Sequence, residues 1–172
     1  DAKSLFPDLS DPIAAASLAQ VHYLQTSDGA KAVKILRPGV EMVIDRELRA
    51  MKRAARTVER VNVESRRLKP IAFTDTVAES MQKELDLRLE AGGADEMREL
   101  SFKAGYFHIP VVDWTRSGKR VLTTEWIDGK PLTDPEAPDT ASIDRPALAN
   151  LVTRGFLDHA IHHGVFHADM HE

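Results

Sequence analysis

The chain has 172 residues, with 23 Lys and Arg against 27 Asp and Glu, and therefore a formal net charge of −4. This length is enough to bury the core of one domain or slightly more. A composition of 42% hydrophobic and 29% charged residues excludes a disordered, collagen-like or low-complexity chain. The absence of cysteine excludes a disulfide framework, a thiolate metal site and a cysteine nucleophile. No apolar run is long enough to cross a membrane.

The charges are unevenly distributed along the chain. Residues 46–69 contain nine basic residues against three acidic ones, whereas residues 125–144 contain six acidic residues against one lysine. The basic segment is either a solvated helix face or a surface for an anionic partner, such as lipid headgroups or nucleic acid. The negative net charge argues against nucleic acid.

The first half of the chain predicts a β-hairpin followed by two helices. Residues 21–24 and 32–36 have strand composition and are separated by Ser27-Asp28-Gly29, a turn sequence. Helical patterns follow over residues 41–61 and 74–100. In the second helix an apolar residue recurs every four positions and forms one stripe, namely Val77, Met81, Leu85 and Leu89.

The second half predicts two further short strands, over residues 109–112 and 120–126. An acidic, proline-containing connector spans residues 134–144, and a last helix over residues 145–163 is stopped by Gly164. Residues 165–167 predict a short strand or an extended turn, and the chain is expected to hold about five strands. Strands that come first and helices that follow indicate the α+β class, with a seam between a strand-rich and a helical part near residues 129–144.

Two segments carry residues suited to binding phosphate. Small residues in Pro12–Val21 lead into a strand, where backbone N–H groups can approach an anion, although alanine runs also form packed helices. Lys34 lies inside an apolar strand, where it either points to solvent from a sheet edge or faces phosphate while a carboxylate holds it.

The second predicted helix supplies carboxylates. Asp86 and Glu90 fall four residues apart on one helix face, and like charges at that spacing repel, so the pair suits a site beside Lys34 or a magnesium ion. Glu84 pairs more naturally with Arg88 at the helix surface. Simple surface positions are the alternative for all three carboxylates.

The C-terminal residues combine histidine with aspartate. Asp169 follows an apolar segment, and this end of the chain also holds His159, His162, His163, His167 and His171. Asp169 could therefore act as a general base or a metal ligand, and the histidines could bind zinc or iron. Solvent-facing histidines around a helix end are the alternative.

The order of these motifs is more specific than any one of them. The sequence resembles the UbiB family of atypical, protein-kinase-like proteins, also called AarF-domain-containing kinases. The stretches that match are PIAAASLAQVH (12–22), AVKILRPGV (32–40), ELDLRLEA (84–91), RVLTTEWIDG (120–129) and VFHADMH (165–171). The resemblance implies a kinase-like fold with a strand-rich N-lobe and inserted helices over residues 1–129. Residues 130–172 would then begin the helical C-lobe and end in its catalytic loop.

The resemblance also implies roles for individual residues. An alanine-rich loop would lie over the phosphates of ATP, with nucleotide-binding positions at Ile13, Ala14, Ala15, Ala16, Ser17, Leu18, Ala19, Gln20 and Val21. Lys34 would contact the α- and β-phosphates with Glu90 as its partner. Loss of either partner would cost about 3–5 kcal/mol if the pair is buried. Glu84 and Asp86 would form the E-x-D pair of the family.

Further implied roles lie toward the C-terminus. Glu125 to Ile127 would form the hinge strand that holds adenine through its backbone, so Glu125 and Ile127 are expected at the cofactor site. Asp169 would be the catalytic aspartate, and His167 would precede it as the histidine of the same motif.

At the level of function, the resemblance implies a kinase-like ATPase that binds ATP or ADP with Mg²⁺ and supports ubiquinone (coenzyme Q) biosynthesis. Expected partners are anionic membrane lipid and proteins of that pathway, and no nucleic acid. The expected place is the cytoplasmic face of the inner membrane in a bacterium or the matrix side in a mitochondrion. A non-catalytic nucleotide-binding scaffold and a metal-dependent hydrolase built on His163, His167, Asp169 and His171 remain alternatives.

Several departures from the family pattern accompany the match. The Lys-x-Gly-Gln segment of the family is absent, and Glu172 stands where the family continues with Pro-Gly-Asn. Gly92-Gly93 replace the more usual Ala-Asn, and the loop between Asp28 and Lys34 is about one residue short. Because the magnesium ligands of the family would lie beyond Glu172, we expect an internal fragment that is inactive by itself.

Overall fold

The computed structural model describes residues 5–62, 64–129 and 143–166. Four antiparallel strands form one sheet in the order β1-β2-β3-β4. The strands are β1 (Pro12–Ala15), β2 (Ala19–Thr26), β3 (Gly29–Leu36) and β4 (Val121–Glu125). The helices are α2 (Val40–Val61), α3 (Pro70–Glu84), α4 (Leu87–Ala104) and α5 (Arg145–Asp158), with short turns η1 (Glu64–Leu68), η2 (Trp114–Arg116) and the π-helical η3 (His159–His163). The expected mixture of strands and helices is confirmed.

The strand expected over residues 109–112 does not form. Within residues 109–112 only Val112 makes a β-bridge, to Thr124, and Pro110 lacks the N–H that a ladder needs. Val165 and Phe166 have no regular structure, and His167 lies outside the described residues. The alanine-rich segment is not helical, because Pro12–Ala15 is strand β1.

The single helix expected over residues 74–100 is wrong. α3 ends at Glu84, and α4 begins at Leu87 after a break at Leu85 and Asp86. The Asp86 side chain caps α4 by accepting a hydrogen bond from the backbone N–H of Arg88 at 3.2 Å. The change of helix axis interrupts the apolar stripe, so Leu85 is buried whereas Leu89 is 57% exposed.

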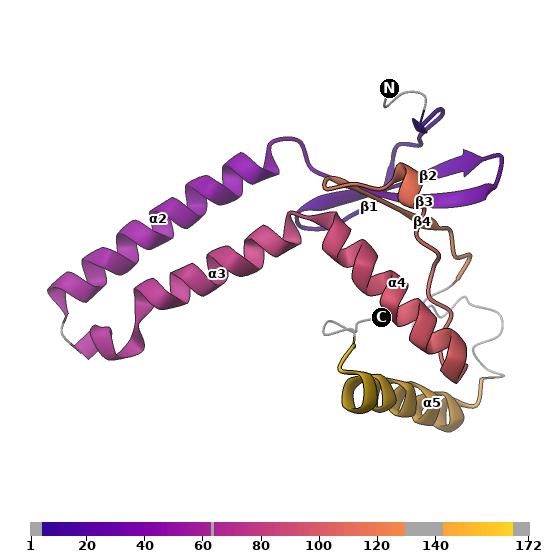
Figure 1. The fold of residues 1–172 in the computed structure, drawn as a ribbon. Coiled ribbons are helices and arrows are strands. Elements are labelled where there is room, and N and C mark those ends of the chain that lie inside the picture. The colour runs from indigo at the N-terminus through magenta and orange to yellow at the C-terminus, as the bar shows by residue number, and fades with distance from the viewer. Residues whose placement is uncertain (1–4, 63, 130–142, 167–172) are drawn as a thin grey trace.

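The main core lies between the sheet and α4, as the arrangement in Figure 1 shows. Leu36 and Leu122 of the sheet pack with Leu87 and Ala91 of α4. The N-terminus of α4 is tied to the segment before β4, because the Leu87 N–H donates to the Lys119 carbonyl at 3.0 Å. This packing fixes the first turn of α4 against the strands.

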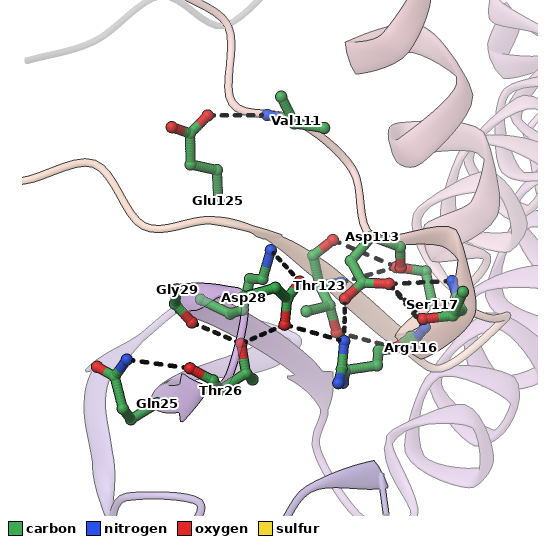
Figure 2. Close-up of polar contacts among 12 residues, drawn as sticks. Gln25, Thr26, Asp28, Gly29, Val111, Asp113, Arg116, Ser117, Thr123 and Glu125 are labelled. Carbon is green, nitrogen blue, oxygen red and sulfur yellow. Dashed lines mark hydrogen bonds and ion pairs between the residues drawn. The ribbon is translucent and has the colours of Figure 1, made fainter.

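The opposite face of the sheet is closed by η2 and by polar contacts, which Figure 2 shows in close-up. The buried hydroxyl of Thr123 donates to the Arg116 carbonyl at 2.9 Å. The Arg116 guanidinium pairs with Asp113 at 2.6 Å and lies 3.9 Å from Asp28 in the β2–β3 turn. These contacts connect η2 to β4 and to the β2–β3 turn.

Helices α2 and α3 form an antiparallel pair that extends away from the sheet, with η1 at its far end (Figure 1). Ala55 and Thr74 are buried, and Lys52 pairs with Asp75 across the two helices at 2.5 Å. None of the described helices is long and apolar enough to cross a bilayer.

Two glycines in helices have opposite surroundings, which gives a test of this packing. A Cβ at Gly155 in α5 would lie 2.5 Å from the Phe107 ring and 3.1 Å from Tyr106 Cβ, whereas a Cβ at Gly92 in α4 would meet nothing within 4 Å. We expect Gly155→Ala to lower the free energy of unfolding by about 1–3 kcal/mol. Gly92→Ala should raise it by about 0.5–1 kcal/mol, since alanine favours a helix interior. Urea unfolding of both variants checks this, and equal effects of the two would contradict the packing of α5.

Candidate nucleotide site on the sheet

The feature that defines this site is an ion pair between the sheet and α4. Both carboxylate oxygens of Glu90 lie 2.8 Å from the Lys34 ammonium. β3 is an inner strand of the sheet, so the alternative of a lysine on an edge strand is wrong. Glu90 stands in the first turn of α4, and the expected Lys34–Glu90 pair is confirmed. Phosphate binding by this pair stays a prediction.

The pair is only partly buried. The side chains of Lys34 and Glu90 are 31% and 47% exposed. The cost of 3–5 kcal/mol expected for a buried pair therefore does not apply, and a contribution to stability of about 0–1 kcal/mol suits an exposed pair. The exposure also leaves the ammonium accessible to a ligand.

The alanine-rich segment lies in register with Lys34. Ala14 pairs with Val21, Val21 with Lys34, and Lys34 with Leu122, so the four residues form one row across the sheet. Paired residues of an antiparallel sheet point to the same face, and strands are about 4.8 Å apart. Ala14 thus stands about 10 Å from Lys34 on the face that carries the ion pair.

A tight turn connects β1 to β2 at Ser17-Leu18. The Ala16 N–H donates to the Ala19 carbonyl at 3.0 Å. Between residues 9 and 28 no residue has a positive φ, so this turn does not need glycine. Positions 13–17 are exposed, whereas the Ala19 side chain is buried in the core and does not face a ligand.

Arg37 holds this turn, a role that the sequence did not suggest. Its guanidinium donates to the Ala16 carbonyl at 3.2 Å, and its backbone N–H donates to the Leu18 carbonyl at 2.9 Å. Arg37 directly follows the strand of Lys34, so the turn and the ion pair are fixed to the same strand.

The E-x-D residues lie at the α3–α4 break rather than along one helix. Glu84 is exposed at the end of α3, and the expected Glu84–Arg88 contact is wrong. Arg88 instead pairs with Asp86 at 2.6 Å. Asp86 is the N-cap of α4, four residues before Glu90, and its carboxylate is bound by Arg88. Asp86 therefore fixes the start of the helix that presents Glu90.

Hydrogen bonds shift the pKa of two turn aspartates. The Arg88 guanidinium lowers the pKa of Asp86 to about 2, and the Thr26 hydroxyl, followed by Lys31, lowers the pKa of Asp28 to about 2. A lowered pKa in the folded state means that the contribution to stability is present above the unfolded pKa near 3.8 and is lost as the pH falls toward 2.

We therefore expect the free energy of unfolding to fall between about pH 4 and pH 2. Chemical unfolding across this window checks the prediction, with Asp86→Asn and Asp28→Asn as matched variants. Each variant should reduce the slope of the free energy of unfolding against pH. A wild-type stability that does not change across the window would contradict the assignment.

The segment expected to form the hinge leads out of β4. The Glu125 N–H donates to the Val111 carbonyl at 2.8 Å, and the Glu125 carboxylate accepts from the Val111 N–H at 3.4 Å (Figure 2). The Trp126 N–H donates to the Ala30 carbonyl at 3.1 Å. Ile127 follows with an exposed side chain. Adenine binding by this segment stays a prediction.

The histidines of α5 and η3 do not gather around a metal. His159 is buried, with its Nε2 3.3 Å from the Ser101 hydroxyl, and His162 lies 2.8 Å from Asp158. Across residues 5–62, 64–129 and 143–166 no three His, Asp or Glu side chains are arranged to hold a metal ion. His167, Asp169 and His171 lie outside these ranges, as does most of the expected domain boundary at residues 129–144.

Fold and site together define a class of protein. An antiparallel sheet whose inner strand carries a lysine, bound by a glutamate of the adjoining helix, is the arrangement of a protein-kinase-like N-lobe. The family model of the ABC1 atypical kinase-like domain matches residues 1–172. The chain belongs to this family.

Curated relatives agree with that assignment. The chain is 37% identical over 169 residues, 97% of its length, to a probable protein kinase UbiB of Marinobacter nauticus. It is 34% identical over 162 residues, 94% of its length, to a probable protein kinase UbiB of Cellvibrio japonicus. The matches span 31% and 29% of these two relatives, so the chain corresponds to less than a third of their length.

Proposed function

We propose that the full-length protein is a kinase-like ATPase that binds ATP or ADP with Mg²⁺ and supports ubiquinone biosynthesis at a membrane surface. The observation that carries the nucleotide part is the Lys34–Glu90 pair on an inner strand, with both Glu90 oxygens 2.8 Å from the ammonium. The pathway and the membrane come from the resemblance to UbiB proteins. The family assignment supports both.

The residues of this chain would act by position and charge. Phosphoryl transfer depends mainly on fixed cations that stabilise the charge of the transferred group. Lys34 would supply such a charge to the α- and β-phosphates, and Glu90 would keep its ammonium in one place. The β1–β2 turn, held by Arg37, would cover the phosphates with backbone N–H groups.

Magnesium would supply further charge neutralisation when nucleotide is bound. Across the described residues no three acidic or histidine side chains are grouped to hold a metal ion by themselves. Mg²⁺ at such a site needs only one or two carboxylates, because the phosphates and water supply its other ligands. Asp169 is the proposed general base, and in that role it would accept the proton of the attacking hydroxyl or water.

The experiment that tests this function is ATP binding and hydrolysis by the full-length protein with Mg²⁺, with and without anionic vesicles. Nucleotide binding together with turnover supports the proposal. Binding without turnover would favour a nucleotide-binding scaffold over an ATPase. If no nucleotide binds at millimolar concentration, the proposal fails at its first step.

A further inference from the structure

Helix α2 of the α2–α3 pair carries a basic face, which follows from the spacing of its arginines. Arginine recurs at intervals of three and four along α2, at Arg46, Arg49, Arg53, Arg56 and Arg60. At about 100° per residue these five positions fall within an arc of about 80°. All five side chains are exposed, on the side of α2 opposite Ala55, which packs toward α3. We call these five residues the arginine face.

Much of this charge is not neutralised locally. Arg46 pairs with Glu47 and Arg49 with Asp45. The ion pairs that α2 makes within the described residues involve Glu41, Arg46, Arg49 and Lys52, and none involves Arg53, Arg56 or Arg60. Residues 46–69 have nine basic against three acidic residues, a net charge of +6, which leaves −10 for the remainder of a chain whose total is −4. An anionic surface would therefore attract this segment and repel the rest.

The far end of the helix pair combines such charges with exposed apolar side chains. Val61 ends α2, Leu68 ends η1 and Phe73 lies in the first turn of α3, and they are 78%, 77% and 64% exposed. Arg66, Arg67 and Lys69 lie between them and are also exposed. We call these six residues the hairpin tip. Figure 1 shows that this end lies away from the sheet.

We propose that the hairpin tip inserts its apolar side chains into the surface of an anionic phospholipid bilayer while the arginine face binds the headgroups. This surface fits lipid better than nucleic acid, because Val61, Leu68 and Phe73 would gain little against a phosphate backbone but much in the acyl boundary. Each Lys or Arg near an anionic membrane strengthens its binding by about 5-fold. The membrane association rests on the proposed function.

The geometry sets how the protein would lie on the membrane. α2 has 22 residues and is therefore about 33 Å long. The arginine face covers about 21 Å of this length, from Arg46 to Arg60, so all five arginines reach headgroups only if α2 lies along the bilayer surface. The bilayer would therefore be bound along the α2–α3 pair, beside the sheet that carries Lys34.

The test is binding of the full-length protein to vesicles of equal parts phosphatidylcholine and phosphatidylglycerol, measured by flotation. The double variant Leu68→Ser with Phe73→Ser, and the triple variant Arg60→Gln, Arg67→Gln and Lys69→Gln, should each lower the partition coefficient at least about 10-fold. Phe102→Ser is the matched control, because Phe102 is 85% exposed on α4. Circular dichroism checks that each variant folds.

A label provides a second measurement. These 172 residues contain no cysteine, so Leu68→Cys and the control Phe102→Cys each introduce one within them. With other cysteines of the full-length protein replaced by serine, an environment-sensitive dye at position 68 should shift to the blue only when anionic vesicles are added. The dye at position 102 should not change.

Three results would overturn the proposal. Tip variants that bind vesicles as wild type does would exclude the hairpin tip as the membrane contact. A dye at position 68 that is shielded without vesicles would show that another part of the protein covers it. Retention on double-stranded DNA, lost in the charge variant and kept in the serine variant, with no vesicle binding, would assign the surface to nucleic acid. None of these readouts depends on ATP turnover, so this proposal and the nucleotide function can fail separately.

Discussion

Replacing Lys34 with methionine is expected to lower ATP turnover by the full-length protein about 100- to 1,000-fold, because one preorganised positive group beside the phosphates is lost. The fold should persist, since the Lys34–Glu90 pair is half exposed and contributes about 0–1 kcal/mol to stability. Turnover at saturating ATP, measured beside thermal unfolding, separates these two effects.

A matched pair on the same helix provides the control. Lys103 and Glu99 of α4 form an ion pair of 2.9 Å at the surface, with no strand residue involved. Lys103→Met and Glu99→Gln should leave turnover unchanged. Lys34→Met and Glu90→Gln should be non-additive when combined, because each removes the same contact. Equal losses from the Lys34 and Lys103 variants would contradict a specific role for Lys34.

Replacing Asp169 with asparagine is expected to lower turnover about 100- to 10,000-fold, because asparagine cannot accept a proton from the attacking group. ATP binding should be retained, since the proposed phosphate contact is made by Lys34. Single-turnover kinetics together with equilibrium binding checks both parts. Asp158→Asn is the control, because Asp158 lies on α5 and contacts His162. Unchanged turnover in Asp169→Asn would remove this residue from the mechanism.

Much of the sheet and the long helix could be predicted from the sequence, because local signals agreed with the tertiary structure. The β2–β3 hairpin follows from two strand-forming segments and the Asp28-Gly29 turn, and it is observed. α2 begins and ends within one residue of its predicted bounds. In each case the signal lies within a few residues of the element that it defines.

The break at Asp86 could not be read from periodicity, because residues 74–100 keep an apolar repeat through the capping residue. One available signal was Asp86 itself, an N-cap residue with an acidic residue in the turn that follows it. The change of axis moves Leu89 out to solvent and leaves Glu90 directed at Lys34. The error in the helix therefore did not affect the predicted ion pair, which depended on the order of motifs.

Contacts between segments far apart in the chain could not be predicted from the sequence, for a different reason. The hydrogen bond from the Arg37 guanidinium to the Ala16 carbonyl depends on how two strands lie across the sheet, and no local sequence pattern predicts it. The exposure of Leu68 and Phe73 likewise depends on where the α2–α3 pair points. Such features appear only when the elements are placed in space.

The central claim is that nucleotide phosphates bind on the α4 side of the sheet, against Lys34. A crystal structure of the full-length protein with Mg²⁺ and a non-hydrolysable ATP analogue tests it most directly. We predict an α- or β-phosphate oxygen within about 3 Å of the Lys34 ammonium, with the β1–β2 turn over the phosphates. A nucleotide bound elsewhere, with the Lys34–Glu90 pair far from any phosphate, would contradict the claim.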